Sequence, residues 1–153
     1  MKVVYLDIDG VLNCHSTKVS VGGYCGIERE KVLLLKQILD STNAKVVLIS
    51  SWKEGWIKDN KKKPFQSFFA RYLDEEFKKV GIAIHDKTAG GVYARSEGIL
   101  EYNERFTVKK FVILDDTYAD YDGYDLTPVL VKTNAEKGLG VPEMEQAIKL
   151  LDK

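Results

Sequence analysis

Residues 3–12 read Val-Val-Tyr-Leu-Asp-Ile-Asp-Gly-Val-Leu, and this stretch decides the fold class. Residues 3–6 form an unbroken apolar run, which is typical of a strand in a parallel sheet that helices cover on both faces. The run leads into Asp7 and Asp9, and Gly10 follows them. Ligands of open α/β sheets bind outside the carboxyl ends of the strands, so both acids stand where a functional site is expected.

The rest of the chain alternates β-rich runs with runs of helical period. Together with residues 2–9, strands are predicted over 45–50, 81–87, 111–116 and 128–133. Helices are predicted over 28–40, from Phe65 to a stop at Gly81, from Ser96 to Arg105, and onward from Pro142. Five strands that alternate with four helices predict a three-layer α/β/α sandwich around a central parallel five-stranded sheet, in a single domain over residues 1–153.

Composition and charge exclude several classes of protein. Of the 153 residues, 44% are hydrophobic and 30% are charged, a globular balance that excludes a disordered or collagen-like chain. The 23 basic and 23 acidic residues cancel, which argues against a polybasic nucleic-acid binder and leaves a local basic patch open.

The sequence also indicates where the protein works. No apolar run approaches the roughly 18 residues that a membrane span needs, so no membrane partner is expected. Asp7 comes too early to leave room for a signal-peptide core. Cys14 and Cys25 form no C-x-x-C pair. We therefore expect a reduced, cytoplasmic protein.

Acidic and hydroxyl side chains follow three of the predicted strands. They are Asp7 and Asp9, Ser50 and Ser51, and Asp115 and Asp116. At an effective dielectric constant near 20, two carboxylates about 4 Å apart repel each other by about 4 kcal/mol, so a cation has to offset the cluster. Hard oxygen ligands favour Mg²⁺. A single Asp-Gly equally well marks a turn, but acids at two strand ends favour a metal site.

Three segments resemble, in order, motifs of the haloacid dehalogenase (HAD) superfamily. Residues 4–12 resemble its first motif, residues 46–50 its second and residues 112–116 its fourth. Ile49-Ser50-Ser51-Trp52-Lys53, Leu114-Asp115-Asp116, and Lys132-Thr133 followed by Gly138-Leu139 resemble one branch in particular. That branch is the small HAD domains called Swiss Army Knife RNA-repair-like.

The resemblance implies a HAD-like Rossmannoid fold and a phosphatase reaction. Asp7 is implied to be the nucleophile, which forms an aspartyl-phosphate. Asp9 is implied to be the general acid and base, and an acid at that position points to a phosphatase rather than a dehalogenase. Asp7, the main-chain carbonyl of Asp9, and Asp115 are implied to hold Mg²⁺, with Asp116 as a further ligand or one that acts through water.

The phosphate-binding residues are also implied by the resemblance. Ser50 is expected to donate a hydrogen bond to a phosphate oxygen, with Ser51 as the alternative. The third motif, which supplies a cation, is the least clear of the four. Arg95 is favoured because a guanidinium clamps phosphate through two hydrogen bonds, and Lys87 is its rival.

The nature of the substrate follows from what the chain lacks. No long insertion interrupts the predicted core, so we expect no large cap domain and only a small hairpin flap around Gly22 and Gly23. An open site suits a bulky phosphorylated substrate such as a nucleic-acid end. A basic run beside the second motif either guides a polyanion or is a solvated loop; it contains Lys53, Lys58, Lys61, Lys62 and Lys63. A small-metabolite phosphatase is the alternative.

Two further classes of protein fit the sequence less well. A receiver-type signalling domain carries its acceptor Asp after the third strand, whereas here that strand ends in His85-Asp86-Lys87 and paired acids recur after the fourth. A non-catalytic phosphate-binding module is disfavoured by the intact pair of Asp7 and Asp9.

Residues 116–125 do not fit a calcium loop. In that loop Asp120 is expected beside the metal ligands, and its three tyrosines either stack on a base or pack the loop.

Overall fold

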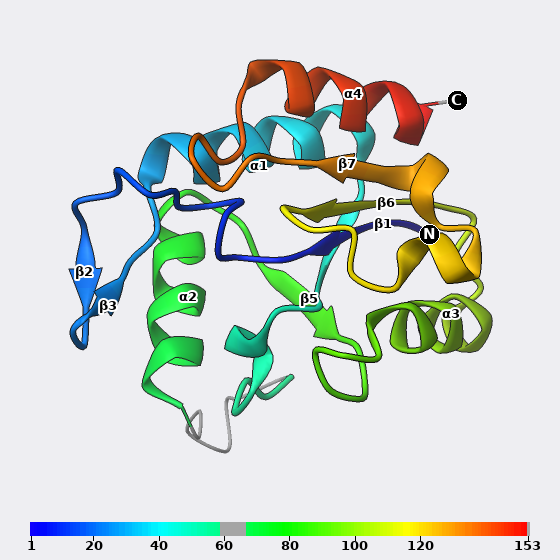
Figure 1. The fold of residues 1–153 in the computed structure, drawn as a ribbon, viewed down its shortest axis with the longest axis horizontal. Helices are drawn as coiled ribbons and strands as arrows, with labels where there is room; N and C mark the ends of the chain where they lie inside the picture. Colours follow the sequence, from blue (N-terminus) through cyan, green and yellow to red (C-terminus); the bar gives the residue numbers. More distant parts are fainter. Residues whose placement is uncertain (59–66, 153) are drawn as a thin grey trace.

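The core of the molecule is a parallel sheet of five strands in the order β5-β4-β1-β6-β7 (Figure 1). A computed structural model describes residues 1–58 and 67–152 of the chain. The strands are β1 (Lys2–Leu6), β4 (Lys45–Leu48), β5 (Ile84–Lys87), β6 (Lys110–Asp115) and β7 (Leu130–Lys132). β1 lies in the middle, where Tyr5 is paired with Val47 on one side and Ile113 on the other. This position explains the unbroken apolar run, because both faces of β1 are buried.

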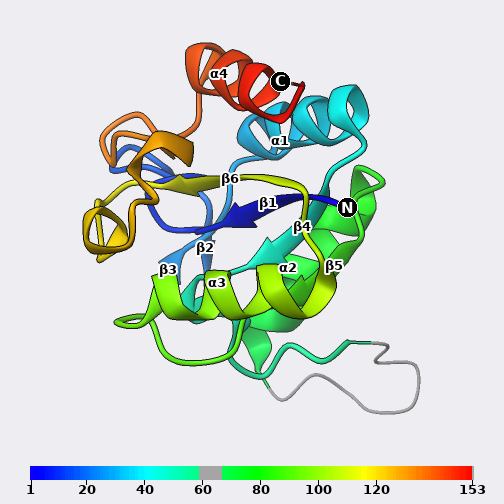
Figure 2. The same cartoon turned by 90° about the vertical axis from the view of Figure 1, so that its right-hand side faces the viewer.

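Four helices cover the two faces of the sheet. They are α1 (Arg29–Thr42), α2 (Phe68–Lys79), α3 (Arg95–Phe106) and α4 (Val141–Asp152). α1, α2 and α4 contribute to one hydrophobic core, and α3 contributes to the other with the 3-10 helix η3 (Tyr121–Tyr124). Figure 2 shows α1 and α4 next to each other on one side of the sheet and α3 on the other. The predicted α/β/α sandwich is confirmed.

Several element boundaries differ from the predicted ones. α3 begins at Arg95, so Ser96 is not its N-cap; Ser96 lies in the first turn, and its N–H and hydroxyl donate to Asp120 Oδ1 at 3.2 and 2.7 Å. The last strand starts at Leu130 because a short 3-10 helix containing Pro128 precedes it. α2 begins at Phe68, with the Ser67 hydroxyl as its cap, and Phe65 lies outside the described residues.

A small hairpin stands between β1 and α1. It consists of β2 (Ser20–Val21) and β3 (Tyr24–Cys25), which are antiparallel. Gly22 and Gly23 form its turn with φ of 55° and 80°, conformations that glycine adopts at little cost. This is the expected flap, and Figure 1 shows it projecting beside α2. Within the described ranges, no helix is long and apolar enough to cross a membrane.

Candidate active site

Three carboxylates gather where β1 and β6 end. Asp7 directly follows β1, and its N–H donates to the carbonyl of Leu114 at 2.9 Å, which places it next to Asp115. One oxygen from each of Asp7, Asp115 and Asp116 lies within 4.8 Å of the other two. Asp7 and Asp115 are buried, and Asp116 is half-buried. The structure therefore brings together the side chains of three of the four predicted acids.

The turn after Asp9 packs closely against the Asp116 carboxylate. Gly10 has a φ of 80°, and a Cβ atom on it would collide with the Asp116 carboxylate. The carbonyl of Gly10 accepts a hydrogen bond from the hydroxyl of Thr133 at 2.7 Å. A glycine is required here for two reasons, its left-handed backbone and the close approach of the acid. The Asp-Gly pair that the sequence shows is thus both a turn and part of the site.

The acid cluster is electrostatically costly without a cation. Burial, followed by repulsion from Asp115, raises the pKa of Asp7 to about 8, although Arg95 opposes the shift. Burial and Asp115 also raise the pKa of Asp116. Oxygen donors in this number and spacing are the ligands that Mg²⁺ prefers, and a divalent ion beside them would favour their charged forms. The residues present therefore fit a Mg²⁺ site.

Arg95 contacts the acid cluster through both of its Nη atoms. Its Nη1 donates to Asp115 Oδ2, and its Nη2 donates to Asp7 Oδ1 at 3.4 Å. Lys87 instead donates its Nζ proton to the carbonyl of Lys53 at 3.2 Å. Arg95, and not Lys87, therefore contacts Asp7 and Asp115. Among the described residues, the buried Nε of Arg95 has no hydrogen-bond partner.

The loop after β6 orients Asp115. Asp115 Oδ1 accepts from the N–H and hydroxyl of Thr117 at 3.0 and 3.2 Å, and Oδ2 accepts from the Tyr121 hydroxyl at 2.6 Å. Tyr121 is fully buried, so it cannot stack on a base, and the interpretation of this tyrosine as packed is correct. Asp120 was expected beside the metal ligands, but it holds the start of α3 through Ser96. The neighbouring residue Tyr121 is the one that contacts Asp115, and no pattern in the sequence indicated this contact.

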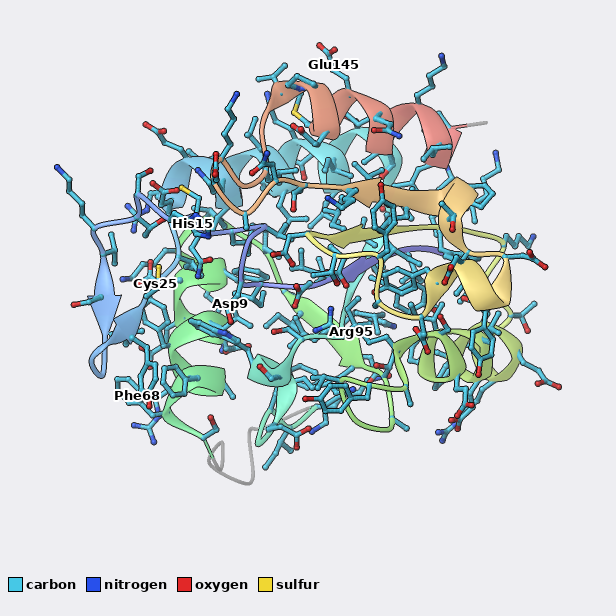
Figure 3. The ribbon with its side chains drawn as sticks, viewed as in Figure 1. Asp9, His15, Cys25, Phe68, Arg95 and Glu145 are labelled. Carbon is cyan, nitrogen blue, oxygen red and sulfur yellow. The ribbon has the colours of Figure 1, made fainter. Side chains whose placement is uncertain are left out.

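Asp9 lies apart from the acid cluster and is exposed. Its Oδ1 accepts from Asn13 Nδ2 and its Oδ2 accepts from Trp52 Nε1, both at 3.0 Å. Asn13 is itself fixed, because it accepts from the N–H of Gly10 at 2.9 Å and donates to the carbonyl of Gly26 at 3.0 Å. Figure 3 shows Asp9 on the flap side of the site and Arg95 on the other side. Asn13 and Trp52 thus hold the Asp9 carboxylate, and the sequence did not indicate either contact.

The two serines after β4 differ in their surroundings. Ser50 is buried, and its Oγ accepts from the N–H of Trp52 at 3.2 Å, a contact that uses a lone pair and not the hydroxyl proton. Ser50 can therefore still donate to a phosphate oxygen. Ser51 is exposed and begins the short 3-10 helix η1 (Ser51–Lys53).

The lysines of the predicted basic run differ in how exposed they are. Lys53 is buried, and its Nζ donates to the carbonyl and hydroxyl of Thr88 at 3.0 and 3.1 Å, so it belongs to neither a solvated loop nor a polyanion track. Burial lowers the pKa of Lys53. Lys58 is exposed and pairs with Asp86 at 3.2 Å. The remaining lysines, Lys61, Lys62 and Lys63, lie outside the described residues.

Most of the chain matches a model of a known protein family. Residues 3–144 match the family model described as the HAD domain in Swiss Army Knife RNA repair proteins. The matched range contains Asp7, Asp9, Ser50, Arg95 and the Asp115-Asp116 pair. Comparisons with curated proteins and with solved structures gave no match.

Proposed function

This chain belongs to the family of HAD domains in Swiss Army Knife RNA repair proteins, and we propose that it is a Mg²⁺-dependent phosphatase that works through a phosphorylated Asp7. The observation that carries the proposal is the cluster of three carboxylate oxygens within 4.8 Å of one another, with Arg95 beside them. Repulsion among the three carboxylates lowers the stability of the fold. Clusters of this kind are found at functional sites, where a bound cation offsets the repulsion and an anionic substrate binds beside it.

Asp7, Asp115 and Asp116 are the side chains that would hold the metal, with the main-chain carbonyl of Asp9 as a fourth donor. When bound, Mg²⁺ neutralises the charge between the nucleophile and the phosphate, so that one anion can approach the other. Tyr121 and Thr117 keep the Asp115 carboxylate turned toward Asp7.

The reaction has two displacements at phosphorus. In the first, an Asp7 oxygen attacks, the bond between phosphorus and the ester oxygen breaks, and Asp9 gives its proton to the departing alcohol. In the second, Asp9 takes a proton from water, the resulting hydroxide attacks phosphorus, and the bond to the Asp7 oxygen breaks. Inorganic phosphate leaves and both carboxyl groups return to their starting state.

Arg95 and Ser50 are proposed to bind the phosphate. The Nε–H of Arg95 is buried without a partner in the described part of the chain, so it is free to donate to a phosphate oxygen. The Ser50 hydroxyl proton is likewise not engaged by the contact with Trp52. Charge-assisted hydrogen bonds of this kind are about twice as strong as those between neutral groups.

We propose a phosphorylated nucleic-acid end as the substrate. The family description names RNA repair proteins. Between β1 and α1, the described chain carries only a two-stranded flap over the site, which leaves room for a bulky molecule. A small-metabolite phosphatase is the alternative outcome of the test below.

The first experiment measures hydrolysis of an aryl phosphate by the purified protein with Mg²⁺, with and without excess chelator. We expect turnover that chelation abolishes and added Mg²⁺ restores. As a control, Asp125→Asn changes an exposed aspartate outside the site whose φ of 58° suits asparagine, and it should behave as wild type. Activity that persists in excess chelator would contradict the metal site.

The second experiment compares oligonucleotides that carry a 3′- or a 5′-phosphate. We expect turnover that weakens as salt rises, because contacts to the nucleic-acid backbone release counterions. Neutralising Lys61, Lys62 and Lys63 together should lower this turnover and leave the aryl phosphate unaffected. If no oligonucleotide is hydrolysed while small phosphates are, the enzyme acts on small metabolites.

A further inference from the structure

A cavity of about 410 Å³ opens beside Asp9, on the flap side of the site. Three aromatic side chains line it, and they come from three separate segments: Tyr24 from the flap, Trp52 from η1 and Phe69 from α2. Figure 3 shows Asp9, Cys25 and Phe68 around this side of the molecule, with Arg95 across the site from them.

The three rings form one continuous apolar surface. Trp52 and Phe69 meet edge to face with centroids 5.3 Å apart, and Tyr24 meets Phe69 edge to face at 5.4 Å. Trp52 is buried, but Tyr24 is 66% exposed. Exposed aromatic rings of this size gain stability when a planar group covers them. The cavity therefore offers a stacking surface that the fold itself leaves uncovered.

The position of Asp9 decides which part of a substrate reaches this cavity. A general acid must lie within hydrogen-bond reach of the leaving oxygen. Trp52 Nε1 donates to Asp9 Oδ2 at 3.0 Å, so the same indole both orients the acid and forms a wall of the cavity. A phosphate bound beside Asp7 and Arg95 would place the leaving alcohol near Asp9, from where it can extend into the aromatic cavity.

The polar residues of the cavity disfavour a negative charge on the leaving alcohol. They include Ser51 and Glu54, and among the described residues no lysine or arginine lines the cavity. A second phosphate would be repelled by Glu54, whereas an amino group or a sugar hydroxyl can donate to its carboxylate. The lining thus favours a planar, uncharged group that carries hydrogen-bond donors.

We propose that this cavity binds the base of the nucleoside that carries the phosphate to be removed, with the base stacked against Tyr24 and Phe69. The inference rests on the proposed phosphatase function and makes it more specific: the enzyme recognises the nucleoside on the leaving-group side. Stacking of bases on aromatic side chains is tolerant of base identity, so the cavity accepts any of the common bases.

The test compares AMP with ribose 5-phosphate, which both release the 5-hydroxyl of a ribose and differ at C1, where AMP carries the base and ribose 5-phosphate a hydroxyl. We expect kcat/KM for AMP to exceed that for ribose 5-phosphate by about tenfold or more, as stacking of one base implies. In Tyr24→Ala this ratio should fall toward one. The control is Tyr124→Ala, which removes a partly exposed tyrosine on η3 and should leave the ratio as in wild type.

Two further arms complete the design. An oligonucleotide that ends in 5′-phosphoadenosine, compared with AMP, assigns the site to a nucleic-acid end or to a free nucleotide according to which is turned over faster. Calorimetry with Asp7→Asn and the two small phosphates measures recognition of the base without turnover. If wild type hydrolyses nothing but Asp7→Asn binds AMP more tightly in a Tyr24-dependent way, the phosphatase proposal fails and the cavity assignment stands.

Equal kcat/KM and equal binding for AMP and ribose 5-phosphate would overturn the inference. So would a preference for AMP that Tyr24→Ala and Phe69→Leu both leave intact, because the base would then bind elsewhere.

Discussion

Asp7 and Asp9 stand two residues apart on one chain segment, but they lie in contrasting surroundings. Asp7 is buried between Asp115 and Arg95, where burial raises its pKa to about 8. Asp9 is exposed, and its carboxylate accepts hydrogen bonds from two neutral donors, Asn13 and Trp52. Charged neighbours dominate the surroundings of Asp7, whereas hydrogen bonds from neutral groups orient Asp9.

The contrast teaches how one sequence motif can serve two roles. Carboxylates in different environments acquire different chemistry, because charge and burial set which form is stable. Asp7 is placed to act as an anion once a cation arrives. Asp9 is exposed, and in the proposed reaction it exchanges a proton with the alcohol or with water. A single substitution can remove either environment without the other.

The largest effect is expected from Asp7→Asn. Removing a nucleophile typically costs about 10⁴-fold or more in kcat, so turnover of an aryl phosphate should be lost while the fold is retained. Steady-state kinetics together with circular dichroism measure both properties. Wild-type-like turnover by this variant, with Asp125→Asn run beside it as a control, would sink the covalent mechanism.

Asp9→Asn should slow the reaction by about 10²–10⁴-fold, which is the range of general acid–base catalysis. The loss should grow as the leaving alcohol becomes more basic, since a poor leaving group needs the proton most. Rates are measured for a series of aryl and alkyl phosphates. An equal loss across the series would remove Asp9 from the role of acid.

Asp115→Ala should raise the Mg²⁺ concentration needed for half-maximal activity by about 10²-fold, since even supporting residues of metal sites change affinity by about 10–100-fold. The measurement is a Mg²⁺ titration of activity at fixed substrate. Tyr121→Phe, which keeps the ring and removes the hydrogen bond to Asp115, should shift the titration in the same direction by less. An unchanged titration for Asp115→Ala would contradict its assignment as a ligand.

The pH dependence of stability should report the Asp7 environment directly. The folded-state pKa of Asp7, about 8, lies above its ordinary value of 3.8, so its ionisation disfavours the folded state. In the absence of metal, wild type should lose stability relative to Asp7→Asn as pH rises from 4 to 8, with an upper bound of about 6 kcal/mol, since the pKa lies roughly four units above its ordinary value and each unit corresponds to about 1.4 kcal/mol. Urea unfolding across this range measures the difference. If the difference in the free energy of unfolding stayed constant with pH, the folded-state pKa of Asp7 would not be raised.

The smallest effect is expected from Asn13→Ala, which removes one donor to Asp9. Turnover should fall by about 3- to 10-fold, mostly for alkyl phosphates, because the acid is less well oriented. Asn103→Ala is the control: it removes a hydrogen bond from Tyr5 beneath the sheet and should lower stability without changing the ratio of alkyl to aryl rates. Equal behaviour of the two variants would mean that Asn13 serves stability alone.

Much of the fold was predictable, because buried strands leave a local signature. The apolar runs before Asp7 and Asp115 identified central strands, and acids at their carboxyl ends had to converge in a parallel sheet. Element boundaries were less predictable. Ser96 has the chemistry of an N-cap, but Asp120, which is distant in the sequence, takes over that role.

The contacts of the site were less predictable than its acids, because they join segments far apart in the sequence. Trp52 reaches Asp9, and Tyr121 reaches Asp115, through side-chain tips whose meeting has no periodicity to reveal it. Lys53 was expected in a basic run because lysine is usually exposed. It is buried because Thr88 offers it both a carbonyl and a hydroxyl.

The neighbours Asp120 and Tyr121 have a consequence for anyone who edits or transplants this site. Asp120 holds the first turn of α3, which carries Arg95, and Tyr121 holds Asp115. Two adjacent residues of one loop therefore set the spacing between the guanidinium and the acid it contacts. A loop graft that changed the distance from Asp116 to Asp120 by a single residue would separate these partners, although no residue of the graft touched a substrate. Length, more than composition, is the property of this loop that a design must preserve.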